Sequence, residues 1–307
     1  MIIEKSGGGE KQPVGRVVLF DKDEGEFSFS NFTSVLRIKD NKELISEFLY
    51  IYLLYIYKRG DTLKMQKATT GIHNIEFDKY LAIDIPCLPL SEQQRIVARL
   101  DAAFAHIDEL KANAEKQLSE ARTLFQKALT KALEPKDGWK EKTLGDIAKI
   151  THGKNQKEVL SENGLYPIYG SGGNIMGYAK DFLCEAGTTI LGRKGSINNP
   201  MFIEERFWNV DTAFGISAKE GNDSKFVFYY IKSINWQEKN TGTTLPSLTQ
   251  QVVGNVKLYV PTFSEQQRIV ARLDSLSEKV RKYEEIQQKV IAECDALKQA
   301  LLRKVFE

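Results

Sequence analysis

Four loops in the second half of the sequence carry side chains that could contact nucleic acid. They combine glycine with amide, hydroxyl and basic groups, in GKNQK (153–157), YGSGGN (169–174), GRKGSINN (192–199) and TGTT (241–244). Arginine, asparagine and serine match the hydrogen-bonding edges of bases, whereas lysine and exposed backbone amides suit phosphates. The candidate DNA-contacting residues are Lys154, Asn155, Tyr169, Ser171, Asn174, Arg193, Lys194, Ser196, Asn198, Asn199 and Thr243.

The same loops also have a simpler interpretation as surface turns. Glycine, asparagine and serine are common turn formers, and each loop taken singly is more typical of a turn than of a binding site. The loop at 169–174 does not match GxxxxGK[ST], which argues against a nucleotide-binding P-loop. The loops therefore become candidates for DNA contact only if the rest of the chain indicates a DNA-binding architecture.

No combination of residues in the sequence indicates catalysis. The HExxH and GxSxG motifs are absent, and the three histidines are dispersed. The three cysteines are far apart and lack CxxC spacing, which argues against a zinc site or a disulfide scaffold and favours a reducing cytoplasm. We therefore expect a protein that is not an enzyme and that holds no cofactor or metal.

The composition sets broad limits on the class of protein. A chain of 307 residues predicts two or three domains, and its 42% hydrophobic content is normal for a globular protein. The net charge of +2 does not by itself indicate a nucleic-acid partner. The N-terminus lacks the pattern of a signal peptide, and the most apolar run, FLYIYLLYIY (48–57), is about half the length that spans a bilayer. It predicts a buried helix, and we expect no membrane segment.

An exact internal repeat is the strongest feature of the sequence. SEQQRIVARLD occurs at 91–101 and again at 264–274, which gives eleven identities at an offset of 173 residues. The surroundings repeat more loosely, for example FLYIYL (48–53) and FVFYYI (226–231). An offset this large indicates a duplicated domain with its connector, because solenoid units run for only about 20–50 residues.

Each copy of the repeat opens a long helical pattern. In the first copy, apolar and small residues alternate at spacings of four and three, namely Ile96, Leu100, Ala103, Ile107, Leu110, Ala114, Gln117, Ala121, Leu124 and Ala128. Such a stripe, without proline or glycine, predicts a coiled coil. Each SEQQ also resembles a capping box, with Ser91 or Ser264 as the N-cap.

The duplication favours one arrangement of the two long helices. A helix pair alone is typical of a dimerisation stalk, but here the first helix must connect two globular units. The second helix has no third unit to reach, so it can return antiparallel along the first. About 40 residues at roughly 1.5 Å each give a spacer of about 60 Å.

This layout resembles the specificity subunit of Type I restriction–modification systems, over nearly the whole chain. The motifs that carry the resemblance are PLSEQQRIVARLD (89–101), PTFSEQQRIVARLD (261–274), LFQKALTKALE (124–134), GWKEKTLGDIAKITHGK (138–154), GTTILGRKGSI (187–197) and WNVDTAFGI (208–216). The resemblance implies a mixed α+β fold, with two globular α/β target-recognition-like domains joined by two long antiparallel coiled-coil helices. The implied domains are a partial first recognition domain at 1–90, spacer helices at 91–135 and 264–307, and a complete second recognition domain at 136–263.

The resemblance also implies a function and partners. Each recognition domain would read one half of a bipartite target in double-stranded DNA through the major groove. The spacer helices would dock two adenine methyltransferase subunits, and restriction subunits with ATPase and nuclease activity would join them. S-adenosylmethionine, ATP and magnesium would belong to those partners.

The first recognition domain departs from the family pattern. Aligning IIEKSGGG (2–9) with TILGRKGS (189–196) leaves no counterpart for the segment from WKEKTLGDI to YGSGGN, about 50 residues. We therefore expect residues 1–90 to fold only in part or against a neighbour, with a second polypeptide as one means of completion. The alternative function is a truncated assembly or regulatory subunit that binds the methyltransferase but reads at most one half-site. A stand-alone enzyme with a coiled-coil stalk has little support.

Overall fold

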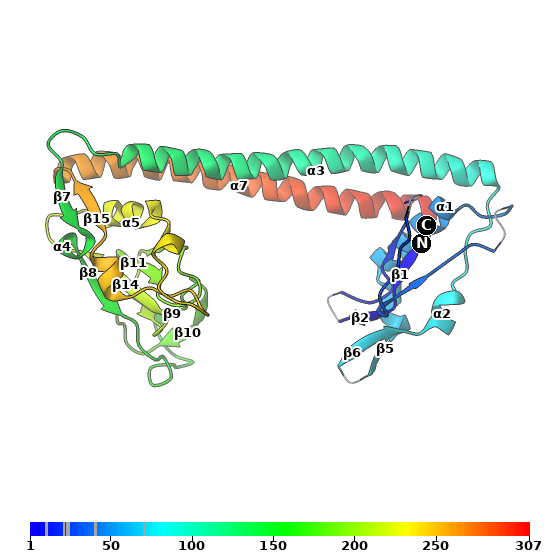
Figure 1. Cartoon of the computed structure of the whole chain (residues 1–307), viewed down its shortest axis with the longest axis horizontal. Helices are drawn as coiled ribbons and strands as arrows, with labels where there is room; N and C mark the ends of the chain where they lie inside the picture. The colour runs from blue at the N-terminus through cyan, green and yellow to red at the C-terminus, as the bar shows by residue number, and fades with distance from the viewer. Residues whose placement is uncertain (10–11, 21, 23–24, 40–41, 70) are drawn as a thin grey trace. The chain divides into compact units, whose positions relative to one another are not determined.

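The computed structural model describes residues 1–9, 12–20, 22, 25–39, 42–69 and 71–307, and the chain divides into two units. Unit 1 comprises Met1–Leu118 and Glu285–Glu307, and unit 2 comprises Ser119–Glu284. Each unit contains one β-rich domain and a part of both long helices, α3 (Leu90–Ala132) and α7 (Phe263–Phe306) (Figure 1). Within the described ranges, every helix is too short or too polar to cross a membrane.

The domain of unit 2 contains three small sheets. Its elements are β7 (Lys140–Thr143), α4 (Leu144–Ile147), β8 (Ala148–His152), β9 (Tyr166–Tyr169), β10 (Ile175–Ala179), β11 (Thr188–Gly192), β12 (Met201–Ile203), β13 (Trp208–Asn209), β14 (Ala213–Ala218), α5 (Ser224–Ser233), η2 (Trp236–Lys239), α6 (Gln250–Gly254) and β15 (Lys257–Val260). The sheets have the strand orders β12-β11-β14-β8, β10-β9-β13 and β15-β7. The run TTILG, buried at all five positions, forms the inner strand β11, as expected of an apolar β-branched segment.

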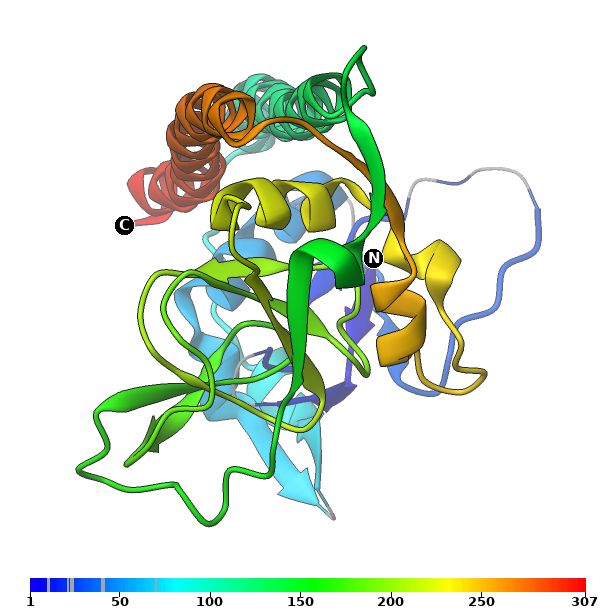
Figure 2. The same ribbon diagram turned by 90° about the vertical axis from the view of Figure 1, so that its left-hand side faces the viewer.

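Helix α5 joins the sheet of unit 2 to the long helices. Val227 and Ile231 on one face pack into the core with Phe214 of β14. On the opposite face, Phe226 and Tyr229 pack against both α3 and α7. The helix therefore lies between the sheet and the paired helices, as Figure 2 shows.

The described residues of the domain in unit 1 form two three-stranded sheets. Its elements are β1 (Ile2–Glu4), β2 (Ser6–Gly8), β3 (Val17–Val18), β4 (Thr33–Val35), α1 (Ser46–Arg59), η1 (Asp61–Met65), β5 (Gln66–Thr69), β6 (Ile72–Ile75) and α2 (Phe77–Leu81). The strand orders are β3-β1-β4 and β2-β6-β5. The apolar run at 48–57 lies in α1 and buries six residues between Phe48 and Ile56, which confirms the prediction of a buried helix.

The two domains share a set of elements that occur in the same order. In unit 1, the central strand β1 pairs antiparallel with β3 and β4, and Ile3 lies opposite Ser34. In unit 2, β11 pairs in the same way with β12 and β14, and Ile190 lies opposite Gly215. A helix (α1 or α5), a 3-10 turn and a short helix (α2 or α6) then precede the long helix in each unit. The duplication read from the sequence is therefore a duplication of structure.

Helices α3 and α7 run antiparallel, which confirms the predicted fold class. Within unit 1, Lys111 Nζ lies 2.8 Å from Asp295 Oδ1, and Lys298 binds Asp108 further along. Within unit 2, Arg122 Nε lies 2.7 Å from Glu284 Oε1. In these ion pairs, the residue number on α7 decreases as the residue number on α3 increases, which is the order of an antiparallel pair. These ion pairs are exposed and each contributes little stability, so the apolar seam between the helices must provide most of it.

The apolar seam follows the predicted stripe only in part. Leu100, Ile107 and Ala114 are buried as expected, but Leu110 and Leu124 are exposed. Toward the end of α3, Phe125, Leu129 and Leu133 are buried instead. The buried positions shift along the helix because that part of α3 also packs against α5, whose Phe226 and Tyr229 belong to the same cluster.

The repeated SEQQ does not form the predicted capping box. The long helices begin at Leu90 and Phe263, so Ser91 and Ser264 already lie inside the first turn and are exposed. The first glutamine of each motif is buried instead. Gln93 accepts a hydrogen bond from the backbone of Ile45 at 3.0 Å and donates to the carbonyl of Leu88.

Gln266 makes the equivalent contacts in unit 2. Its side chain accepts from the backbone N–H of Asp223 at 2.8 Å and donates to the carbonyl of Pro261 at 3.2 Å. Asp223 is the N-cap of α5, just as Ile45 is the N-cap of α1. Each repeated glutamine therefore fastens the start of the domain helix to the start of the long helix, and satisfies buried backbone groups in doing so.

Candidate nucleic-acid interface

Two of the four candidate loops are joined through the segment between β13 and β14. The backbone N–H groups of Arg193 and Lys194 both donate to the carbonyl of Thr212, at 2.8 and 3.1 Å. The N–H of Lys154 donates to the carbonyl of Asn209 at 3.0 Å. Loops 153–157 and 192–199 therefore meet at one end of the β11–β14 pair.

The loop at 241–247 pairs directly with loop 192–199. The N–H of Leu248 donates to the carbonyl of Arg193 at 2.8 Å, and the N–H of Gly195 donates to that of Pro246 at the same distance. Lys194 and Ser247 form an isolated antiparallel bridge between these contacts. The two loops therefore form one continuous backbone surface.

Asn240 shapes the loop at 241–247, although the sequence analysis did not single it out. Its side-chain oxygen accepts hydrogen bonds from the N–H groups of Gly242 and Ser247, both at 2.8 Å. Its amide nitrogen donates to the carbonyl of Gly242. An asparagine ahead of a Thr-Gly pair is a known signal for such a side-chain-stabilised turn, and this signal could have identified the residue.

Loop 169–174 lies beside Ser196. A Cβ built on Gly172 would lie 3.6 Å from the Ser196 hydroxyl, so the Ser196 side chain lies close to the backbone of Gly172. Gly192 is tighter, because a Cβ there would lie 2.1 Å from the carbonyl oxygen of Ser196. The loop returns so close to residue 192 that only glycine fits there. Together with the hydrogen bonds described for the other loops, the contact with Ser196 places all four loops in one cluster.

Most of the candidate side chains are accessible in this loop cluster. Lys154, Asn155, Asn174, Lys194, Ser196, Asn198, Asn199 and Thr243 are exposed, whereas Ser171 and Arg193 are partly buried. Two of the asparagines also have structural contacts. Asn155 accepts from the N–H of Lys157 at 3.0 Å, and Asn198 accepts from the N–H of Trp236 at 2.8 Å. Nε of Arg193 is buried and makes no hydrogen bond to the described residues.

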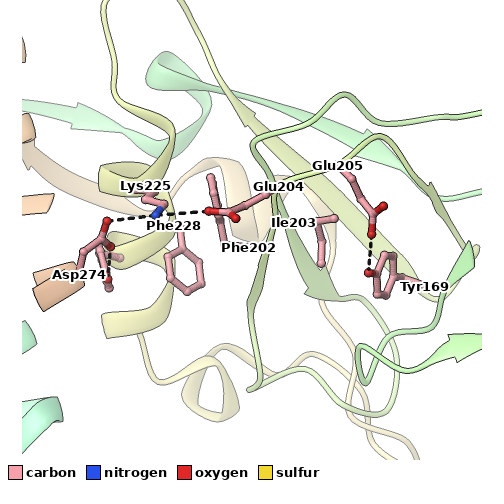
Figure 3. Close-up of a pocket in the computed structure, with 9 residues that line it drawn as sticks. Tyr169, Phe202, Ile203, Glu204, Glu205, Lys225, Phe228 and Asp274 are labelled. Carbon is pink, nitrogen blue, oxygen red and sulfur yellow. Dashed lines mark hydrogen bonds and ion pairs between the residues drawn. The ribbon is translucent and has the colours of Figure 1, made fainter. Parts of the chain in front are cut away.

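Tyr169 is a core residue in this structure, not an accessible one. Its side chain is 9% exposed, and its ring packs edge-on against Phe207. The hydroxyl donates to Glu205 at 3.3 Å, and burial with this carboxylate raises the pKa of the tyrosine (Figure 3). The residue ends strand β9 and points inward, and the glycine-rich turn starts only after it. Tyr169 therefore does not belong to the proposed contact surface.

The side chains that line the pocket drawn in Figure 3 connect the β-rich domain of unit 2 to α7. It has a volume of about 450 Å³, and Lys225 of α5 lies between two of the carboxylates that line it. Its Nζ is 3.0 Å from Asp274 and 3.4 Å from Glu204, and Asp274 also accepts from the hydroxyl of Tyr229 at 2.6 Å. The hydrogen bond to Asp274 raises the pKa of Lys225, and burial raises that of Tyr229. This polar network holds α5 against α7.

The residues that the structure describes include no group of three or more histidine, cysteine or acidic side chains that could hold a metal ion. Cys184, the cysteine closest to the loop cluster in the sequence, is buried, and its thiol lies 3.3 Å from the side-chain oxygen of Asn209. Burial raises the pKa of this thiol to about 12, which keeps it protonated and unreactive. The chemistry that the loop cluster offers is hydrogen bonding and positive charge.

Comparison with known proteins gives a family match. A family model described as "Type I restriction modification DNA specificity domain" matches residues 2–120 and 136–291. The Type I restriction enzyme EcoprrI specificity subunit of Escherichia coli is 26% identical over 241 residues, covering 74% of this chain and 59% of that protein. The putative type I specificity subunit S.MpnORF507P of Mycoplasma pneumoniae is 23% identical over 265 residues, covering 82% and 69%. The chain thus spans about three fifths of the length of the E. coli relative.

Solved structures share the fold. A chain solved in work on complex assembly and conformational transition of the type I R-M system superposes with a TM-score of 0.79 at 20% identity, covering 100% of this chain and 81% of that one. The Type-I restriction-modification system S subunit from M. genitalium gives a TM-score of 0.52 at 21% identity, covering 98% and 82%. At these identities the likeness shows the fold alone.

Proposed function

The chain belongs to the Type I restriction modification DNA specificity family, and from that premise we propose that it is the subunit that selects the DNA target of such a system. In this role it is non-catalytic and acts in the cytoplasm. The observation that supports the proposal best is the loop cluster of unit 2. Four loops, hydrogen-bonded to one another or in close contact, present Lys154, Arg193, Lys194 and several amides and hydroxyls on one surface.

Unit 1 retains an equivalent of half of this cluster, which supports a bipartite target. Strand β2 follows β1 as loop 192–199 follows β11, and β2 pairs with β6 through Ser6 and Asn74. This pairing corresponds to the bridge between Lys194 and Ser247 in unit 2. We therefore assign one half of the target to each unit, with unit 2 contributing the larger set of contacts.

Replacing Arg193 or Lys194 by alanine tests the loop cluster. Removing a lysine that contacts phosphate should weaken binding to every DNA sequence. It should also reduce the slope of log affinity against log salt concentration by about one unit. Removing an arginine that reads a base should cost about 1–3 kcal/mol of binding free energy, and only at one position of the target. Salt-titrated binding to target and scrambled duplexes measures both, with Lys289→Ala on α7 as the control. Unchanged affinity in both variants would remove this loop from the interface.

The repeated sequence SEQQRIVARLD also indicates how the chain could bind other subunits. Packing explains why Gln93, Val97 and Leu100 recur as Gln266, Val270 and Leu273, because all six are buried. Packing does not explain the exposed identities, which we call the shared stripe: Ser91, Gln94, Arg95, Ala98 and Arg99, repeated as Ser264, Gln267, Arg268, Ala271 and Arg272. Their spacing of three and four residues places each set on one helical face.

Two identical exposed faces fit two copies of one partner. In unit 2, Arg268 and Arg272 of the shared stripe line a groove of about 470 Å³ with charges of both signs, which also include Lys131, Lys136, Glu134 and Glu265. We assign these faces to two adenine methyltransferase subunits, one at each face. In this account restriction subunits, with ATPase and nuclease activity, join the complex afterwards.

Charge reversal in the shared stripe tests this stoichiometry. Arg95→Glu and Arg268→Glu should each reduce the methyltransferase bound to one copy per chain, and the double variant should bind none. Each substitution replaces an exposed cation by an anion on one helical face, and each face binds one methyltransferase subunit. Mass measurement of the purified complex reads the stoichiometry, and Lys180→Glu on the recognition domain serves as the control. Full occupancy in the double variant would show that the partner binds elsewhere.

A further inference from the structure

Two adjoining grooves of unit 2 are lined by lysines and amides. The first has a volume of about 630 Å³ and is lined mainly by β8 and α6, and the second has a volume of about 590 Å³. Gln251 and Asn255 line both, so the two grooves form one surface, which we call the lysine groove. None of the described residues that line it is acidic, and its cations are Lys149, Lys219, Lys239 and Lys257.

This composition sets the lysine groove apart from the other hollows of unit 2. The pocket of Figure 3 includes three carboxylates, and the groove that contains Arg268 includes two. A mixed lining of that kind neutralises itself, whereas a lining of lysines and amides offers hydrogen-bond donors and positive charge. The lysine groove therefore suits an anionic ligand.

Two of the four lysines have partners, and two do not. Lys257 Nζ lies 2.8 Å from Glu141, and Lys219 donates to the carbonyl of Gly145. Lys149 and Lys239 are exposed, and neither forms an ion pair with any residue in the part of the chain that the structure describes. The positive charge of the groove thus rests mainly on Lys149 and Lys239.

One end of the lysine groove adjoins the loop cluster. Strand β8 and helix α6 lie side by side, because His152 Nε2 is 2.7 Å from Gln250 Oε1 and a Cβ on Gly145 would lie 3.3 Å from the carbonyl oxygen of Gly254. At the first of these contacts, β8 continues directly into loop 153–157.

Helix α6 leads to the same loops from its other side. It begins two residues after Leu248, whose N–H donates to the carbonyl of Arg193 at 2.8 Å. Both walls of the first groove therefore extend from segments that belong to the loop cluster, and an elongated ligand that contacts the loops could continue into the groove.

From its charge and its position we propose that the lysine groove binds the phosphate backbone of the DNA duplex beside the bases that the loop cluster contacts. Lysines and amides are the usual donors to phosphate oxygens, and such contacts position the duplex without reading its sequence. The groove therefore contributes affinity, and the loop cluster contributes sequence selection. This inference rests on the proposed function and extends it to a second surface.

The experiment compares variants of the full chain in its complex with the methyltransferase. The probes are two mixed-sequence duplexes of equal length, one with the methylated motif and one with that motif scrambled. In the double variant Lys149→Ala/Lys239→Ala, the slope of log affinity against log salt concentration should fall by about two units, since each lost phosphate contact removes about 0.9. Both duplexes should be weakened by the same factor. Lys149→Arg/Lys239→Arg keeps the charges and should keep the slope.

The control is Lys282→Ala/Lys289→Ala on α7. It removes the same charge from two exposed lysines that pair only with carboxylates of their own helix, Glu278 and Glu293. The control should bind both duplexes with the slope of the parent. Because Lys149 and Lys239 are also exposed, the double alanine variant in the groove should melt like the parent.

Three results would overturn the proposal. The first is an unchanged slope in Lys149→Ala/Lys239→Ala while the parent binds DNA, which would leave the proposed function intact. The second is an equal fall in the control, which would mean that net charge alone acts. The third is loss of methyltransferase from the variant complex with the slope retained, which would make an acidic protein surface the occupant. A parent complex that binds neither duplex would instead contradict the proposed function, and this inference with it.

Discussion

Leu273→Asp is expected to separate α7 from α3 and α5 in unit 2 and to lower the stability of that unit sharply. Leu273 is 1% exposed and belongs to the cluster that includes Leu129 and Phe226. The substitution removes a buried leucine, at a cost of about 2–5 kcal/mol, and leaves a carboxylate without a partner in an apolar seam. Domain stabilities are about 5–15 kcal/mol, so this loss is a large fraction of the total.

The matched control is Leu124→Asp. Leu124 lies on α3 in the same unit, and its side chain is 65% exposed. The same chemical change there should leave the melting temperature nearly unchanged, since most of the surface of Leu124 is already in contact with water. Thermal unfolding of both variants, with copurification of the methyltransferase, gives the comparison. Equal melting temperatures for the two variants would contradict the packing of α3 against α7 described above.

Gly192→Ala is expected to disable the loop cluster from within. The added Cβ would lie 2.1 Å from the carbonyl oxygen of Ser196, which is backbone and cannot rotate away. The loop at 192–199 must therefore move, and its bonds to Thr212 and Pro246 break with it. Overpacking of this kind costs about 1–3 kcal/mol. We expect DNA binding by the intact complex to fall at least 10-fold, because Arg193 and Lys194 lose their positions.

Gly172→Ala distinguishes this effect from a general intolerance of the loops. A Cβ on Gly172 would meet its nearest neighbour, the Ser196 hydroxyl, at an ordinary 3.6 Å. This variant should keep both its melting temperature and most of its DNA affinity. If Gly192→Ala bound DNA as well as Gly172→Ala does, the geometry of the loop cluster would not matter for binding.

The sequence predicted the long-range organisation well because the evidence for it was a repeat. Eleven identical residues located the starts of both long helices to within a residue or two, and the duplication favoured their antiparallel course. Local composition was also sufficient for β11, whose apolar β-branched run forms a buried strand. Each of these features is encoded within a short window or in an exact duplication.

The errors arose where tertiary contacts decide the outcome. The repeated serines suggested a capping box, but the buried glutamines Gln93 and Gln266 do the anchoring because a domain helix starts against them. Leu124 fits the helical spacing but is exposed, since α5 packs on the neighbouring face of α3. Tyr169 adjoins a glycine-rich turn and still points into the core.

The clustering of the loops was beyond the reach of the sequence for the same reason. The bridge between Lys194 and Ser247 joins positions more than fifty residues apart, and no local pattern announces it. Asn240 was missed because its role depends on where Ser247 returns, although its own turn has a recognisable pattern. Composition suggested which loops could contact DNA, whereas only the fold shows that they lie together.

Methylome sequencing can show directly whether this chain selects the DNA sites that are methylated. Cells would express the adenine methyltransferase subunit of the system alone, with this chain, or with its Arg193→Ala and Lys194→Ala variants. We predict adenine methylation at a defined motif only when the chain is present, with reduced or relaxed modification at one half of the motif in the variants. A split motif with a fixed gap would assign reading to both units, and a single short motif would assign it to unit 2 alone. The same methylation with and without the chain would contradict its role in selecting DNA.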